Sequence, residues 1–206
     1  MSLLELDHIV VVANPLDRGV AHVKEMTGLD MPFGGEHPLM GTHNHLMRLG
    51  EAEFLEVIAV NPEAPDPGRI RWFGLDRTFL TPWLAHWVVR CRDMEAIRPY
   101  LTPEQGQPIP VTRGDLSWLL TVPDDGGMGM EGVLPSVIQW NADPLPPTRM
   151  QGAGAELRKL TLSHPRIAEA RDWLAPLFDD PRVVFEEGLK GLTAEIAIGD
   201  RVVTLK

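Results

Sequence analysis

The sequence lacks several features that define whole classes of protein. It holds one cysteine, Cys91, so no internal disulfide can form, and the apolar run around this residue favours a buried thiol in a reducing compartment. The first residues carry no basic segment, and no apolar run approaches the roughly 18 residues of a membrane span. Basic residues are scarce as well: 19 Lys and Arg stand against 29 Asp and Glu, giving a net charge of -10. Nucleic acid and anionic membranes would be repelled on average, so we expect a cytoplasmic protein that acts on a small-molecule substrate.

One order of predicted elements occurs three times along the 206 residues. A β-branched strand over residues 6–12 leads into Asn14-Pro15, a helix-start signal, and a helical pattern over 16–27 that ends at Gly28. Three strands near 31–33, 42–49 and 54–60 complete a βαβββ unit. The order restarts at residue 84 and again at residue 157. We therefore predict an α+β fold class: tandem βαβββ modules at 1–60 and 84–141 with curved mixed sheets around a cleft, a third βαβββ-like module at 155–206, and linkers at 61–83 and 142–154.

The first two modules carry the same polar residue types at matching places. With the opening strands in register, His8 falls over His86, and with the closing strands in register, Glu56 falls over Gln139. An unpaired polar group inside an apolar strand costs roughly 1 to 3 kcal/mol, and a charge costs more. Two imidazoles, one carboxylate and one amide oxygen suit Zn, Ni, Fe(II), Mn or Co with a position left open. The pattern predicts a divalent metal site, with a metal-free polar pocket or a chance placement as the alternatives.

A second group of polar residues lies on the predicted strand before Glu56. With a short hairpin at 50–53, cross-strand pairs sum to 103, which places His43 and His45 on one face, whereas a one-residue bulge would turn Asn44 inward. We interpret these three residues as candidate substrate contacts, or else as polar strand-end residues without a role. Trp140 flanks the predicted cleft and is a candidate for stacking on the substrate, although aromatic residues on alternating strands commonly belong to the core.

Other motifs point away from nucleotide binding and from hydrolysis. The glycine-rich segment 124–130 lacks the lysine and the strand-to-helix setting of a phosphate loop, and we interpret it as a flap between strands. Ser136 has no nucleophile-elbow context. A hydrolase triad is therefore disfavoured.

Tandem βαβββ modules with His on the first strand and Glu or Gln on the last resemble the vicinal oxygen chelate superfamily, which includes glyoxalase I, extradiol dioxygenases, bleomycin-resistance proteins and epimerases. Residues 6–11, 41–44 and 55–58 resemble its glyoxalase-like domain subgroup, and the resemblance spans most of residues 3–145. It implies that His8, Glu56, His86 and Gln139 are the metal ligands. Gln139 departs from glyoxalase I, which has a second glutamate there that leaves the metal and acts as a base.

The leading functional hypothesis is a glyoxalase-like lyase or isomerase. A divalent metal would stabilise an enediolate intermediate, and Glu56 would act as the catalytic base. One alternative is a metal-free binding or resistance protein. A lower-ranked alternative is an Fe(II) extradiol-type dioxygenase that uses His8, His86 and Glu56.

The third module has no such ligand set. Lys159 stands at the histidine position, and residues 200–205 offer no carboxylate at the centre of the last strand. We interpret this module as structural: it covers a sheet or builds a homodimer interface.

Overall fold

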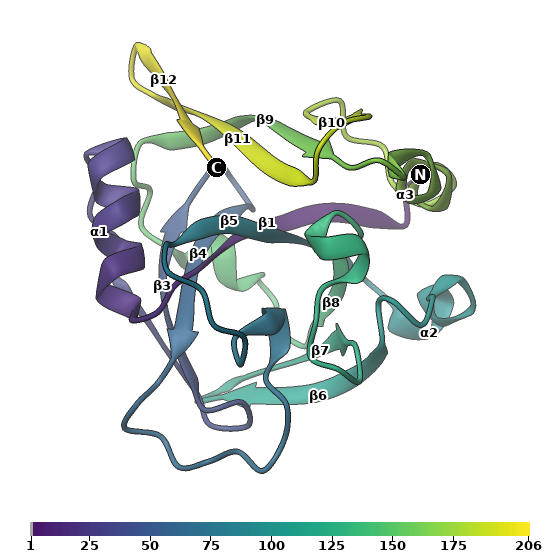
Figure 1. The fold of residues 1–206 in the computed structure, drawn as a ribbon, viewed down its shortest axis with the longest axis horizontal. Helices are drawn as coiled ribbons and strands as arrows, with labels where there is room; N and C mark the ends of the chain where they lie inside the picture. The colour runs from purple at the N-terminus through teal and green to yellow at the C-terminus, as the bar shows by residue number, and fades with distance from the viewer. Residues whose placement is uncertain (1) are drawn as a thin grey trace.

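The computed structural model describes residues 2–206 and has two β-sheets with few helices, as expected of an α+β protein (Figure 1). The larger sheet has eight strands in the order β2-β3-β4-β1-β5-β8-β7-β6. Its strands are β1 (Leu4–Val12), β2 (Phe33–His37), β3 (Thr42–Arg48), β4 (Phe54–Val60), β5 (Trp83–Cys91), β6 (Gln107–Arg113), β7 (Leu116–Val122) and β8 (Ser136–Trp140).

The two halves of this sheet follow one plan. Strand β1 pairs in parallel with β4, and β5 pairs in parallel with β8, while β1 and β5 join the halves as antiparallel neighbours. The sheet curves until its two end strands, β2 and β6, lie close together, so it forms a nearly closed barrel. The predicted tandem βαβββ arrangement around a cleft is confirmed.

The helices lie outside the barrel, where α1 (Leu16–Thr27) packs beside β3 and β4 (Figure 1). It ends as predicted at Gly28, whose φ of 74° is a left-handed conformation that glycine adopts without steric cost. The second helix, α2 (Met94–Ile97), begins after Asp93, whose side chain accepts a hydrogen bond from the Glu95 N–H. Short 3-10 turns cover Trp72–Gly74, Arg98–Tyr100, Gly129–Gly132 and Pro146–Arg149. No helix within residues 2–206 has the length and apolar character to span a membrane.

The C-terminal module repeats the order of elements but not their pairing. It comprises β9 (Ala155–Ser163), α3 (Ile167–Leu174), β10 (Val183–Glu186), β11 (Gly191–Ile198) and β12 (Arg201–Leu205). Its sheet order is β10-β9-β11-β12, with β9 parallel to the second strand of its module. In the first module the opening strand is instead parallel to the fourth. The third module is therefore βαβββ in sequence and a different sheet in space.

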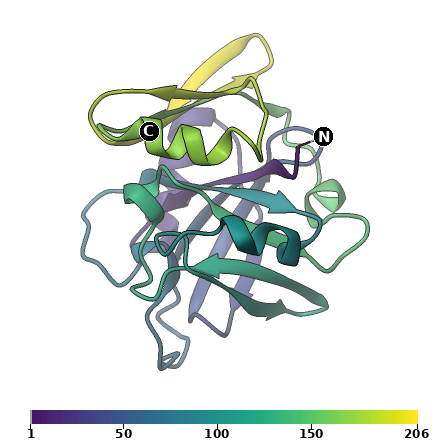
Figure 2. The ribbon, with the colours of Figure 1, turned by 90° about the vertical axis from the view of Figure 1, so that its right-hand side faces the viewer.

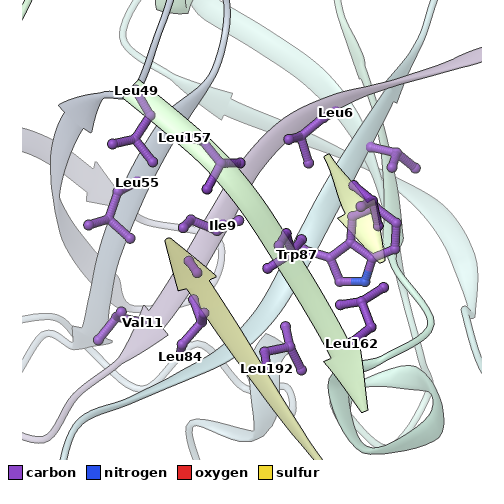
Figure 3. Packing of buried hydrophobic residues seen from close by; sticks show 14 of the residues in the cluster. Leu6, Ile9, Val11, Leu49, Leu55, Leu84, Trp87, Leu157, Leu162 and Leu192 are labelled. Carbon is purple, nitrogen blue, oxygen red and sulfur yellow. The ribbon is translucent and has the colours of Figure 1, made fainter. Parts of the chain in front are cut away.

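This small sheet lies on the outer face of the barrel, over β1 and β5 (Figure 2). The two sheets share one apolar core, in which Leu6 and Ile9 of β1 and Trp87 of β5 meet Leu157 and Leu192 (Figure 3). Each buried leucine or isoleucine contributes roughly 1.5 to 3 kcal/mol relative to an exposed one. Two roles were expected for the third module, and the structure shows one of them: the module covers the outer face of the large sheet.

Candidate functional site

The barrel encloses a pocket lined by side chains from both halves of the large sheet. Side chains alternate between the two faces of a strand, so one residue in two faces inward. The polar and charged lining residues are His8, His37, Asn44, Glu56 and Arg113, and the rest of the wall is apolar: Leu46, Phe54, Trp72, Phe73, Trp118, Leu120, Ile138, Trp140, Pro146 and Met150.

A β-bulge in β1 places His8 in this pocket. The pairing of β1 with β5 slips between Leu6 and His8, leaving Asp7 as the extra residue. Without the slip, His8 would share the face of Leu6 and point into the outer core. Asp7 is fully buried behind the ring, and its Oδ1 lies 2.6 Å from His8 Nδ1. Because a carboxylate only accepts hydrogen bonds, His8 Nδ1 carries the hydrogen and Nε2 faces the pocket.

Glu56 is held opposite His8. Asn44 Nδ2 donates to Glu56 Oε1 at 2.6 Å, and Glu56 Oε2 lies 3.6 Å from His8 Nε2. Glu56 is only 6% exposed and His8 only 5%. Each group is therefore fixed from behind, by an amide on one side and by a buried carboxylate on the other. A carboxylate oxygen and an imidazole nitrogen therefore lie next to each other on the pocket wall, close enough for both to contact one small substrate group.

The register of β3 differs by one residue from the predicted one. Cross-strand partners sum to 102, as in Leu46 opposite Glu56, so Asn44 faces the pocket and both neighbouring histidines face outward. His45 Nδ1 lies 2.6 Å from the Met31 carbonyl oxygen, outside the barrel. His43 also lies outside the pocket wall, and burial is the main cause that lowers its pKa. The prediction of His43 and His45 as pocket residues is wrong, whereas Asn44 lines the pocket.

His86 does not reach the pocket. Its Nδ1 donates to the Gly132 carbonyl at 3.1 Å, and its Nε2 accepts the Ser136 backbone N–H at 3.2 Å. The Phe73 ring lies over it, with centroids 5.4 Å apart. The ring is fully buried, and this desolvation lowers its pKa to about 3, so the imidazole is neutral at ordinary pH. Both ring nitrogens are engaged by the protein, and no lone pair is left for a metal.

Gln139 faces away from the pocket. Within β8, Ile138 and Trp140 line the pocket, so Gln139 between them points to the other face, where its Oε1 accepts the Met94 N–H at 2.6 Å. Pairing shows which residue of β8 corresponds to Glu56. Glu56 pairs with Val10, which lies two residues after His8, and Ser136 pairs with Val88, which lies two residues after His86. Ser136 is therefore the counterpart of Glu56. The sequence register of the closing strands was therefore wrong by three residues.

The predicted four-ligand metal site does not form. His8 and Glu56 face each other, but His86 and Gln139 are engaged elsewhere. No three His, Cys, Asp or Glu side chains within residues 2–206 are grouped so that they could hold a metal ion. The same placement of His86 removes the two-histidine, one-carboxylate triad that Fe(II) ring cleavage requires. The donor set of this chain thus does not fit a resident metal of the glyoxalase I kind.

Two pocket residues had not been identified from the sequence. Arg113 extends from the end of β6 toward Asn44 Oδ1, 3.4 Å away, and His37 Nε2, 3.5 Å away. His37 also has its Nδ1 3.1 Å from Thr42 Oγ1. Burial, and secondly the charge of Arg113, lower the pKa of His37 to about 3. The pocket therefore holds a neutral histidine, one carboxylate opposite His8, and one guanidinium.

Aromatic side chains form much of the remaining wall. Trp72 and Phe73, from the segment between β4 and β5, are buried and pack against the pocket. Trp140 lines the pocket as predicted, and its Nε1 donates to Asp7 Oδ2 at 3.0 Å. The same tryptophan thus forms part of the wall and helps to hold the carboxylate behind His8.

The missed residues carry only faint signals in the sequence. Asp7 and His8 are adjacent, and adjacent residues in a regular strand point to opposite faces; only the bulge brings them into contact. Arg113 ends a strand that contains Pro108 and Pro110, and proline is uncommon within strands. An Arg-Gly pair between two apolar segments, indicating a hairpin turn, was the available sign.

The chain is similar to known proteins in its family and in its fold. A family model described as a glyoxalase-like domain matches residues 6–178. A hypothetical protein from Staphylococcus aureus has 17% identity and a TM-score of 0.63, with 98% of each chain covered, which shows a shared fold. Methylmalonyl-CoA epimerase from Mycobacterium tuberculosis has 18% identity and a TM-score of 0.45, over 70% of this chain and 92% of the other. No curated protein matches.

The family match spans well over half of the chain, and its residues include both halves of the barrel together with β9 and α3. It agrees with the paired βαβββ modules and with the resemblance drawn from the sequence. The chain belongs to the glyoxalase-like domain family, within the vicinal oxygen chelate superfamily.

Proposed function

We propose that the barrel pocket is the active site of a small-molecule enzyme of the lyase or isomerase kind, and that Glu56 removes a proton from a carbon next to a carbonyl group. The observation that carries this proposal is the 3.6 Å approach of Glu56 Oε2 to His8 Nε2 inside an aromatic-walled pocket. Carboxylates and imidazoles positioned within reach of a substrate are the usual general acids and bases. Membership of the glyoxalase-like family supports the same class of chemistry.

The chain supplies the parts that such a proton transfer needs. The C–H bond breaks, its electron pair becomes part of an enolate, and the proton moves to Glu56 Oε2. Asn44 keeps Oε1 occupied, so Oε2 is the oxygen that faces the substrate. His8 Nε2, held by Asp7, can accept that proton in turn and return it to another atom of the substrate. Aromatic walls exclude water, which strengthens each electrostatic interaction in the pocket.

Deuterium incorporation tests this proposal without a known substrate. The protein is incubated in D2O with a panel of aldehydes, ketones, 2-oxo acids and thioesters, and exchange of the hydrogen next to the carbonyl is followed by NMR. We expect exchange for at least one compound class, and a loss of about 100-fold or more for Glu56→Gln, because general-base catalysis contributes about that much. Glu36→Gln, which changes an exposed carboxylate on β2, is the matched control. An unchanged rate for Glu56→Gln would disprove the role of this residue.

A binding or resistance protein is the second candidate, favoured by the aromatic walls of the pocket. A binding protein would retain its ligand when Glu56 is changed, and no member of the panel would exchange deuterium. Calorimetry on wild type and Glu56→Gln with the same compounds separates the two functions: equal affinity without any exchange supports binding alone.

A further inference from the structure

Arg113 is a cation in the pocket that has no anionic partner at contact distance. Its guanidinium lies 3.4 Å from Asn44 Oδ1 and 3.5 Å from a neutral His37, and 5.9 Å from the centre of the Trp118 ring. Within residues 2–206, no carboxylate lies within 4.0 Å of it. Of the other half-buried arginines, Arg71, Arg90 and Arg182 each meet a carboxylate at 2.6 to 2.7 Å, and Arg48 donates to three backbone carbonyls.

An arginine that has no carboxylate partner is suited to bind an anion. A guanidinium carries five N–H donors in a planar fork, and the protein uses two of them in long contacts to uncharged groups. Removing such a charge from water without a partner is costly. The half-buried environment already lowers the pKa of Arg113, and the charge of Glu56 opposes this effect. A carboxylate that bonds the fork through both oxygens would satisfy the free donors.

The end strand β2 is shaped to leave space for this side chain. A Cβ at Gly35 would lie 2.9 Å from Arg113 Cδ, and a Cβ at Gly34 would lie 2.4 Å from Asn44 Oδ1. Gly35 also has a φ of 147°, a conformation that other residues rarely adopt. The two glycines thus allow β2 and β6 to approach with the guanidinium between them.

A groove lies outside the place where β2 meets β6. This groove is basic, although the net charge of the protein is -10. It shares Arg113 with the pocket and is also lined by Arg48 and Arg149, against one acidic residue, Asp115. Arg48 and Arg149 donate to backbone carbonyls, so their charges add to the local potential while their donors are engaged. A positive approach path raises the local concentration of an anionic ligand.

We propose that Arg113 binds the carboxylate of the substrate, so that the enzyme acts on small monocarboxylic acids. This inference rests on the proposed function, because it takes the same pocket as the active site. The carboxylate of the acid bonds the guanidinium near the place where β2 meets β6, and the apolar part of the acid lies against the aromatic wall. The reacting carbon is then directed toward Glu56 and His8. One cation without an anionic partner in the pocket specifies one carboxylate.

Binding of matched acids and amides tests this inference. The probes are propionate, 2-oxobutanoate and 3-phenylpropionate with their neutral amides, and the readout is calorimetry together with quenching of tryptophan fluorescence. We expect at least one acid to bind at least tenfold more tightly than its amide. Arg113→Gln abolishes that preference, Arg113→Lys retains part of it, and Arg158→Gln, which changes an exposed arginine outside both the pocket and the groove, retains all of it.

The outcomes separate this inference from the proposed function. Equal binding of acids and amides, no binding of any acid, or a preference that survives Arg113→Gln in protein with wild-type circular dichroism overturns the carboxylate site. Glu56→Gln removes a negative charge from the pocket, so acids bind that variant as tightly as wild type or more tightly. If acids bind through Arg113 but Glu56→Gln leaves deuterium exchange unchanged, the proposed base fails while the carboxylate site stands.

Discussion

Both carboxylate oxygens of Asp7 are engaged, one by His8 Nδ1 and the other by Trp140 Nε1. A fully buried carboxylate is stable only when such donors surround it. The arrangement connects an aromatic wall of the pocket to the tautomer of His8. At the scale of single residues, the site therefore depends on a side chain that never touches the pocket.

Asp7→Asn tests this dependence. An asparagine offers one acceptor and one N–H₂ group where two acceptors are needed, so the free energy of unfolding falls by about 1 to 3 kcal/mol. The amide also favours the wrong tautomer of His8, and we expect deuterium exchange to fall by about 100-fold or more. Urea unfolding and the NMR assay measure the two effects. Wild-type exchange in Asp7→Asn would show that His8 does not take part.

The buried histidines predict an acid-sensitive stability. The pKa of His37 and that of His86 fall from 6.5 to about 3 on folding, chiefly through burial. The unfolded chain therefore binds more protons between pH 6.5 and 3, and stability is lost as pH falls through this range and is level above it. Each histidine contributes up to about 1.4 kcal/mol per pH unit.

Urea unfolding at pH 7.5, 6.5, 5.5 and 4.5 measures this dependence. His37→Gln and His86→Gln should each reduce the slope between pH 6 and 4 by about one proton relative to wild type. The difference between wild type and variant isolates the histidine from other titrating groups. Parallel curves for wild type and both variants would show that these rings are accessible to protons in the folded state.

At the scale of elements, strong local signals predicted most of the fold. The β-branched run of β1, the stop of α1 at Gly28 and the apolar run of β4 were all readable. The end strands β2 and β6 were harder, because Gly34, Gly35, Pro108 and Pro110 weaken a strand pattern. Such residues are tolerated at the edge of a sheet, where fewer backbone donors are paired.

The candidate site was only half predictable, for a reason that concerns register. His8, Glu56, Asn44 and Trp140 line the pocket, but one-residue changes in pairing decide which neighbours join them. The slip at Asp7 turns His8 inward, and the sum of 102 between β3 and β4 turns His43 and His45 outward. Because side chains alternate with period two, a shift of one residue reverses every assignment on a strand. No local signal in the sequence fixes such a shift.

Gln139→Ala tests the corrected register of β8. Gln139 Oε1 accepts the Met94 N–H at the start of α2, so its loss should lower the free energy of unfolding by about 0.5 to 2 kcal/mol, as for other helix caps. Deuterium exchange and ligand affinity should stay at wild-type values, because the side chain faces away from the pocket. Thermal unfolding and the NMR assay on one preparation are sufficient. A loss of exchange with unchanged stability would return Gln139 to the site.

At the scale of the whole molecule, the third module completes the core. Leu157, Leu162 and Leu192 cover the outer face of β1 and β5, the two strands whose inner faces carry His8 and His86 (Figure 3). The same module contacts the loop that holds His86 in place, since Lys190 and His164 lie against Glu131, one residue before Gly132. The module thus supports the barrel from outside the site.

Removal of residues 151–206 tests this support. The shortened chain exposes Leu6, Ile9, Leu84 and Trp87 to water, each at a cost of roughly 1.5 to 3 kcal/mol. We expect it to be unfolded, aggregated or dimerised through that face, as measured by circular dichroism and size-exclusion chromatography. A monomeric truncated chain with the wild-type unfolding temperature would contradict a structural role for the module. Homodimer formation by the full chain stays a prediction that the same column measures.

The central claim is that proton transfer in this pocket relies on Glu56 and His8 without a resident metal, because His86 and Gln139 are engaged elsewhere. The most direct test is the rate of deuterium exchange before and after treatment with EDTA, followed by addition of Ni²⁺, Co²⁺, Zn²⁺, Mn²⁺ or Fe²⁺. The account predicts an unchanged rate at every step. A rate that falls at least tenfold with EDTA and returns with one of these ions would contradict it.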